Sequence, residues 1–283
     1  MRIVESTKRM VETANSICAD GKTIGFVPTM GFLHDGHLSL MRIAREKCDI
    51  LVVSIYVNPT QFALGEDLDA YPRDFERDEA LCRKEGVDFL FYPSDAEIYP
   101  DGFLTGVTVK ELGGYLCGKS RPTHFDGVTT IVAKLFNIVR PDFAVFGQKD
   151  AQQAAIIKRM TIDLNYQIEI LVGPIVRESD GLAMSSRNKY LTPGERKAAP
   201  ILNRSLEWAR EVIEGRKSVH TSEIVAGMKA QILAAGPFEI DYIEIVDPES
   251  LLPVIDFHGR EVLIALAVKI GNTRLIDNVL ARG

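Results

Sequence analysis

The sequence predicts an α/β protein, with a Rossmann-like, doubly wound parallel sheet followed by a smaller C-terminal α+β domain. Apolar strand-like runs alternate with helix-like segments over the first half of the chain, which is typical of parallel β–α–β units. The run 50–57 is almost continuously apolar, as expected of a strand covered on both faces. Beyond Gly173-Pro174 the pattern changes. We therefore predict two domains, residues 1–175 and 176–283.

In the first domain the periodicity of apolar residues assigns the elements. Ser6 or Thr7 can cap an opening helix that Asp20-Gly21 stops. A glycine-rich stretch at 113–127 is expected to be an irregular functional loop, and 105–112 a further strand. The predicted helices cover 7–19, 38–48, 75–85, 128–139 and 152–164, and the other predicted strands cover 23–27, 50–57, 89–92, 143–146 and 168–172.

The second domain opens with a polar stretch and a clear helix start. Thr192-Pro193-Gly194-Glu195 is a capping box with proline at the first helical position. It predicts a helix to Gly215, which Pro200 can kink. A second helix is expected at 222–235, and strand-like runs at 238–246, 261–269 and 273–279 predict a small antiparallel sheet that completes the lid domain.

Composition narrows the class of protein. The chain has 283 residues, 46% hydrophobic and 25% charged, with a formal net charge of −6, ordinary values for a globular protein. The negative charge argues against a nucleic-acid partner, which needs a basic surface. No apolar run is long enough to span a membrane. The four cysteines lack metal-binding spacing and predict reduced thiols in a cytoplasmic protein.

The stretch Gly25–His37 joins a predicted strand to a predicted helix through a turn with two glycines and two histidines. Such a turn presents unpaired backbone N–H groups, which bind anions. At a helix N-terminus His34 and His37 would be favoured as neutral hydrogen-bond donors to phosphate. A random pair of histidines is more often unrelated, but both fall in one strand–turn–helix corner. His-x-Gly-His in this context resembles the nucleotidyltransferase superfamily.

Further polar groups follow predicted strands, where doubly wound sheets bind ligands. Lys149-Asp150 could hold triphosphate oxygens, although an ordinary exposed lysine is equally consistent. Met184–Asn188 offers hydroxyls and a guanidinium that suit phosphate, or else a polar turn. Gln61 and Gln153 could bind a small hydroxy acid, or be solvated. Asp74 and Asp78 could contribute to Mg²⁺ binding, but acidic residues near a helix start are usually caps.

Taken together, these residues resemble the pantoate–β-alanine ligase family over almost the whole chain. The resemblance rests on five motifs in the family's order. They are Pro28-Thr29-Met30-Gly31 with His34-x-Gly36-His37, Asn58-Pro59-Thr60-Gln61-Phe62, Arg121-Pro122-Thr123-His124-Phe125, Gly147-Gln148-Lys149-Asp150 with Gln153, and Met184-Ser185-Ser186-Arg187-Asn188. One departure is Gln148, where many relatives have Glu.

The resemblance implies a two-step ligation in which pantoate attacks ATP to give pantoyl adenylate and β-alanine then displaces AMP, with Mg²⁺ on the triphosphate. It implies His37, His34 and Lys149 as catalytic residues, with His37 as proton donor. Gln61 and Gln153 would bind pantoate, with Gln61 also near β-alanine, and Arg121, His124 and Asp78 would line the site. A homodimer is expected. The implied ATP site comprises Met30, Gly31, Phe32, Leu33, His34, Asp35, Gly36, His37, Gly147, Gln148, Lys149, Asp150, Val176, Met184, Ser185, Ser186 and Arg187.

Two other functions remain open from the residues alone. One is an adenylyl- or cytidylyltransferase on the same scaffold, which would keep its nucleotide in the product instead of releasing AMP. The other is a nucleotide-binding regulator without catalysis. The retained Lys149, both histidines and both glutamines argue against the regulator.

Overall fold

A computed structural model describes residues 1–63, 65–215 and 220–283. The chain divides into two compact units. The first comprises residues 1–113, 121–147 and 156–174, and the second comprises 114–120, 148–155 and 175–283. Nothing in the sequence pattern predicts that residues 114–120 and 148–155 group with the C-terminal part of the chain.

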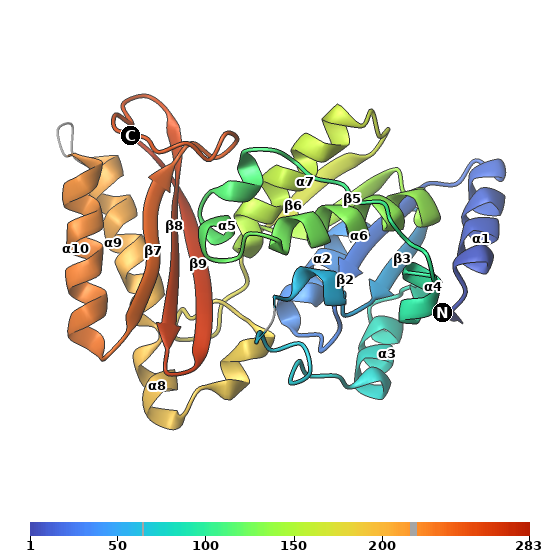
Figure 1. The fold of residues 1–283 in the computed structure, drawn as a ribbon, viewed down its shortest axis with the longest axis horizontal. Helices are drawn as coiled ribbons and strands as arrows, with labels where there is room; N and C mark the ends of the chain where they lie inside the picture. Colours follow the sequence, from blue (N-terminus) through green and yellow to red (C-terminus); the bar gives the residue numbers. More distant parts are fainter. Residues whose placement is uncertain (64, 216–219) are drawn as a thin grey trace. The chain divides into compact units, whose positions relative to one another are not determined.

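The first unit is built on a six-stranded parallel sheet with the order β1-β4-β3-β2-β5-β6. Figure 1 labels β2, β3, β5 and β6. β1 pairs with β4 at the sheet edge and was not predicted, because three residues are too few to show a periodicity. The strands are β1 (Arg2–Val4), β2 (Ile24–Thr29), β3 (Ile50–Ile55), β4 (Phe89–Phe91), β5 (Phe143–Gly147) and β6 (Glu169–Gly173).

Helices cover both faces of this sheet, as the doubly wound prediction requires. α2 and α3 share a hydrophobic core with one face, whereas α1 and α6 pack against each other and against β2 on the other. Right-handed crossovers explain this arrangement. From β2 the chain proceeds through β3 to β4 in one direction along the sheet, and from β4 it returns past β2 to β5 in the opposite direction, so the connecting helices lie on opposite faces. The helices are α1 (Thr7–Ala19), α2 (Asp35–Arg45), α3 (Phe75–Lys84), α4 (Asp95–Ile98), α6 (His124–Val139) and α7 (Ala151–Asp163).

The strand predicted at 105–112 is wrong, and hydrogen bonding explains why. Val107 N donates to Thr130 Oγ1 at 2.9 Å, and Val107 O accepts from Thr129 Oγ1. Threonines of α6 therefore bond the main chain that a neighbouring strand would have bonded. The loop predicted at 113–127 is also partly wrong, because it contains the short helix α5 (Cys117–Ser120) and the first turn of α6.

The second unit contains a three-stranded antiparallel sheet, β7-β8-β9, as predicted. α9 packs on β8 and β9, α10 packs on β7, and their apolar residues form one core. The single helix predicted up to Gly215 is broken at Pro200, which has no N–H to donate. The elements are α8 (Pro193–Ala198), α9 (Ile201–Gly215), α10 (Thr221–Ala235), β7 (Glu239–Val246), β8 (Glu261–Ile270) and β9 (Thr273–Arg282).

Among the described residues, no helix is long and apolar enough to cross a membrane.

Candidate active site

Two histidines meet at the first turn of α2. His34 is the N-cap residue, and its Nδ1 accepts a hydrogen bond from Gly36 N at 3.2 Å. Nδ1 of His37 accepts from His34 N at 3.3 Å, and the two ring centroids lie 4.1 Å apart. A ring nitrogen that accepts a hydrogen bond carries no proton, so each neutral ring holds its proton on Nε2. This tautomer suits the predicted role as a hydrogen-bond donor.

Glycine is required at two positions, one in the turn before α2 and one in the first turn of α2. Gly31 has a φ of +81°, which an L side chain rarely adopts. A Cβ on Gly36 would lie 2.9 Å from two atoms of the His34 ring. The glycines of the predicted phosphate-binding turn are therefore explained by local geometry.

A carboxylate from α3 fixes the main chain of this turn. Asp78 is 1% exposed. Its Oδ2 accepts from Phe32 N at 2.6 Å and its Oδ1 from Leu33 N at 2.8 Å. Burial raises the pKa of Asp78, against the two amide donors that lower it. Asp78 thus positions the segment that leads to His34, a role that the sequence did not reveal.

Asp74 has a different role. Its carboxylate accepts from Arg77 N at 3.2 Å and caps α3, so the capping interpretation of this residue holds. Within residues 1–63, 65–215 and 220–283, no group of three or more His, Cys, Asp or Glu side chains is arranged to hold a metal ion.

Gln61 lies close to the same turn. It is 9% exposed, and its Nε2 approaches Met30 Sδ at 2.9 Å. Asn58 Nδ2 donates to Gln61 Oε1 at 3.3 Å. Two residues that the sequence assigns to different ligands, Met30 and Gln61, are therefore in contact.

The main chain at Gln61 is supported by α6 and the segment before it. Arg121 Nη2 donates to Gln61 O at 3.2 Å, and His124 Nδ1 lies 2.8 Å from the same oxygen. A Cβ on Gly127 would lie 2.4 Å from Thr60 O, so only glycine permits this approach. Glycine inside a helix is costly and signals close packing, which is how the sequence could have pointed to Gly127.

Glu66 holds the guanidinium of Arg121 by two hydrogen bonds, at 2.6 and 2.5 Å. Burial raises the pKa of Glu66, but the hydrogen bonds and charge of Arg121 outweigh it, so the pKa lies below its ordinary value. The pair therefore stabilises the fold fully above the ordinary glutamate pKa. This contribution is lost as the pH falls through the lowered pKa of the folded state.

We expect Glu66→Gln to lower the free energy of unfolding by about 1 kcal/mol at pH 7. The difference from the unchanged protein should be smaller at pH 3, because the contribution of the carboxylate is progressively lost as the pH falls below the ordinary glutamate pKa. Thermal unfolding of both proteins at the two pH values measures this. Glu79→Gln is the matched control, because Glu79 forms an exposed pair with Arg83 worth only about 0.3–0.5 kcal/mol. A Glu66→Gln effect independent of pH would contradict the assignment.

Apart from Gly147, which ends β5 in the first unit, the other predicted ATP residues lie in the second unit. Gln148–Asp150 form a short 3₁₀ turn directly after β5. The Lys149 side chain is 21% exposed and its Nζ lies 4.0 Å from Asp150 Oδ1. Gln153 is half-buried on α7. The Lys149 side chain is thus partly exposed, in the turn directly before α7.

A turn organises the segment from Val176 to Arg187. Val176 O accepts from Met184 N at 3.0 Å. Ser185 Oγ then accepts from Arg187 N at 3.2 Å and caps the next 3₁₀ turn, Ser186–Tyr190. The residues predicted to bind phosphate therefore lie on consecutive turns of main chain, together with the Val176 carbonyl. Phosphate binding and a polar turn, the two interpretations of this motif, are thus compatible.

Comparison with known proteins identifies the family. The family model for pantoate–β-alanine ligase matches residues 2–280. The chain belongs to the pantoate–β-alanine ligase family. The pantothenate synthetase of Caldicellulosiruptor bescii is 55% identical over 99% of both chains, and that of Heliobacterium modesticaldum is 56% identical over 99% of both.

Solved structures of pantoate–β-alanine ligases share the fold. Pantothenate synthetase from Thermus thermophilus has a TM-score of 0.91 and 43% identity over 99% of each chain. The Francisella tularensis enzyme, solved with beta-gamma ATP and β-alanine, has a TM-score of 0.82 and 36% identity, covering 99% of this chain and 97% of its own. The parallel sheet with a small antiparallel sheet is therefore the fold of the pantoate–β-alanine ligases.

Family membership establishes the activity. The protein is an enzyme that joins pantoate to β-alanine and forms pantothenate. The predicted resemblance is confirmed, whereas the cytidylyltransferase and regulator alternatives gain no support from these relatives.

Proposed function

We propose that the enzyme activates pantoate as an acyl adenylate. A pantoate carboxylate oxygen attacks the α-phosphorus of ATP, and the bond to the β-phosphate bridging oxygen breaks, so pyrophosphate leaves. The β-alanine amine then attacks the pantoyl carbonyl of the mixed anhydride, and AMP leaves with the former carboxylate oxygen. Family membership supports this, as does the complex of the Francisella tularensis relative with beta-gamma ATP and β-alanine.

Sheet topology supports the position of the nucleotide. The strand order reverses between β2 and β5, and doubly wound sheets bind ligands at the carboxyl ends of strands where the order reverses. β2 leads into the histidine turn, and β5 is followed directly by Gln148–Asp150. These two segments are the ones to which the motifs assign the α-phosphate.

We assign charge stabilisation to three side chains. Lys149 contributes an ammonium, and His34 and His37 contribute Nε2–H donors, to the α-phosphate and the leaving pyrophosphate. No covalent enzyme nucleophile is needed, so these residues act by position and charge. Met30 to His37, Gly147 to Asp150, Val176 and Met184 to Arg187 form the proposed ATP site.

We also propose that Mg²⁺ binds with ATP and neutralises the negative charge of the triphosphate. It keeps several waters and is often held by one or two carboxylates and substrate phosphates. The absence of a three-residue metal cluster from the described chain is compatible with that mode. The phosphates would then be the main ligands, and Asp78 is committed to the amides of Phe32 and Leu33.

We expect Gln61→Ala to raise the KM for pantoate about tenfold, the effect of losing one hydrogen bond worth about 1.4 kcal/mol. Gln61 and Gln153 are the proposed amide donors to pantoate. Initial rates at saturating ATP and β-alanine measure the change. Gln167→Ala, on an exposed side chain, is the control, and an unchanged KM in Gln61→Ala would remove Gln61 from the pantoate site.

The chemistry is tested with pantoate labelled with ¹⁸O in its carboxylate. One labelled oxygen per turnover should appear in AMP, and pyrophosphate release should require pantoate but not β-alanine. Label in inorganic phosphate, or pyrophosphate release only when β-alanine is present, would contradict an acyl adenylate.

We also propose that the protein is a homodimer in the cytoplasm. This proposal is supported by the resemblance to the family, and the four cysteines are free thiols, as is usual in a reducing compartment. Sedimentation of the purified protein tests the oligomeric state.

A further inference from the structure

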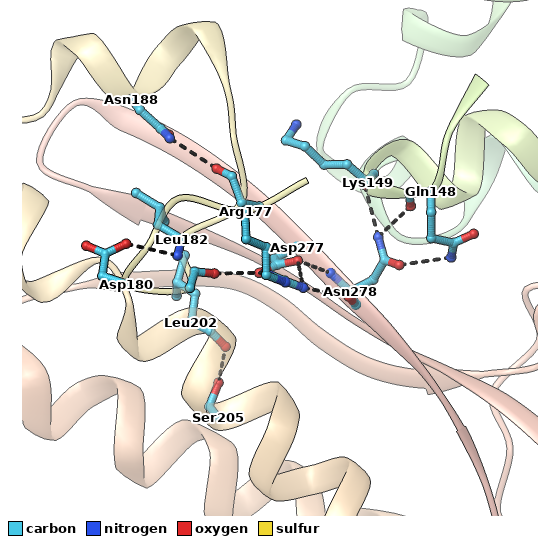
Figure 2. A network of polar contacts seen from close by, with 12 residues as sticks. Gln148, Lys149, Arg177, Asp180, Leu182, Asn188, Leu202, Ser205, Asp277 and Asn278 are labelled. Carbon is cyan, nitrogen blue, oxygen red and sulfur yellow. Dashed lines mark hydrogen bonds and ion pairs between the residues drawn. The ribbon is translucent and has the colours of Figure 1, made fainter. Parts of the chain in front are cut away.

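Asn278 of β9 contacts the main chain beside Lys149 (Figure 2). Its side chain is buried, with 3% of the residue exposed. Nδ2 donates to Gln148 O at 2.9 Å and to Lys149 O at 3.0 Å. Its Oδ1 accepts from Gln148 Nε2 at 3.0 Å. One amide thus donates twice and accepts once, to two consecutive residues of a predicted ATP-binding motif.

Only a primary amide can make all three of these contacts. A carboxylate accepts but cannot donate, and a hydroxyl has a single proton. The two carbonyl groups are fixed by the two hydrogens of one rigid, planar group. Figure 2 shows the Lys149 side chain extending away from Asn278, which contacts its main chain. Asn278 therefore fixes the main-chain position from which the Lys149 side chain extends. It acts on the main chain of Lys149 and not on the ammonium group.

An ion pair with a buried carboxylate holds Asn278 in place. Asn278 N donates to Asp277 Oδ1 at 2.8 Å. Arg177 donates to both carboxylate oxygens of Asp277, at 2.6 and 3.0 Å, and to Gly181 O at 3.1 Å. Asp277 is 3% exposed, so its contacts with a planar bidentate partner are rigid.

The network joins two segments that are far apart in the sequence. Arg177 follows Val176 directly and spans the turn up to Gly181, from which the chain continues into Met184–Arg187. Through Asp277 and Asn278 it is connected to Gln148 and Lys149 (Figure 2). Both segments belong to the proposed ATP site, and the network fixes one relative to the other within the second unit.

We propose that Asn278 is a positioning residue for the adenylation step, acting through the main chain of Lys149. The proposal rests on the role of Lys149 assigned above. A displacement of about 1 Å in a catalytic group can cost about 10²-fold in rate. Loss of the Asn278 donors should therefore slow adenylation about 10- to 100-fold and leave the KM for pantoate unchanged.

The test is a double-mutant cycle on the full chain. Single-turnover pyrophosphate release, with saturating ATP and pantoate, is measured for Asn278→Ala, Lys149→Ala and the double variant. If Asn278 acts through Lys149, the double variant is as slow as Lys149→Ala alone. If the double variant is slower by the full Asn278→Ala factor, Asn278 acts elsewhere and the proposal fails. A normal rate in Lys149→Ala would instead refute the assigned role of Lys149, and the proposal with it.

Three further variants separate positioning from folding. Ser205→Ala removes a different buried polar group in the same unit, a hydroxyl that donates to Leu202 O at 2.8 Å, and should leave adenylation unchanged. Asn278→Asp keeps the shape but loses both donors, so it should be as slow as Asn278→Ala. Asn278→Ser retains one donor and replaces Asn278→Ala in the test if that variant does not fold. Its adenylation rate should lie between those of the unchanged protein and Asn278→Asp. A normal rate in Asn278→Asp would overturn the proposal.

Discussion

Lys149→Ala is expected to slow pantoyl adenylate formation about 10²- to 10³-fold, the usual loss when one transition-state donor is removed. The ammonium interacts most strongly with charge that develops as pyrophosphate leaves, so kcat should fall more than ATP binding weakens. Quenched-flow measurement of pyrophosphate release in a single turnover isolates this step from the later attack by β-alanine.

Lys158→Ala is the control for this prediction. Lys158 is exposed on α7, so its removal changes the net charge equally and should leave the rate unchanged. Normal adenylation by Lys149→Ala would remove Lys149 from the reaction. A rise in the KM for ATP with unchanged kcat would mean that Lys149 stabilises bound ATP and the transition state equally, and so does not accelerate the chemical step.

Asp78→Ala is expected to lower the free energy of unfolding by about 2–5 kcal/mol, because it leaves the Phe32 and Leu33 N–H groups without their acceptor. Phe32 also has a φ of 48°, a conformation that the carboxylate helps to hold. The variant should therefore lose adenylation activity as well, since the backbone that leads into His34 is released. Denaturant unfolding and the single-turnover assay measure the two effects.

Two variants test whether the lost stability and activity come from the acceptor oxygens of Asp78. Asp78→Asn retains one acceptor oxygen and should lose about half as much stability. Asp74→Ala removes the cap of the same helix, should cost about 1 kcal/mol and should leave adenylation intact. If Asp78→Ala unfolded and reacted like the unchanged protein, the turn would not depend on Asp78.

The fold was largely predictable because its strands are long apolar runs separated by amphipathic helices. The failures have physical causes. Residues 105–112 have strand-like composition, but their main chain bonds to Thr129 and Thr130 of α6. A short edge strand such as β1 is defined by its pairing with β4 and not by its own three residues.

The candidate site was predictable where its residues lie within one motif. His34, Gly36 and His37 form their turn with one another, so sequence spacing alone indicates it. The positioning roles of Asp78 and Asn278 were not predicted, because their partners are 46 and 130 residues away. Only the fold brings such residues together.

We have proposed that the histidine turn and Lys149 bind the same phosphates. A crystal structure of the protein with a non-hydrolysable pantoyl adenylate analogue measures this directly. We expect the Lys149 Nζ and the His37 Nε2 to lie within about 3.2 Å of oxygens on the group that replaces the α-phosphate, or of one bridging water. An analogue bound by one of these residues, with the other remote from every oxygen of that group, would contradict it.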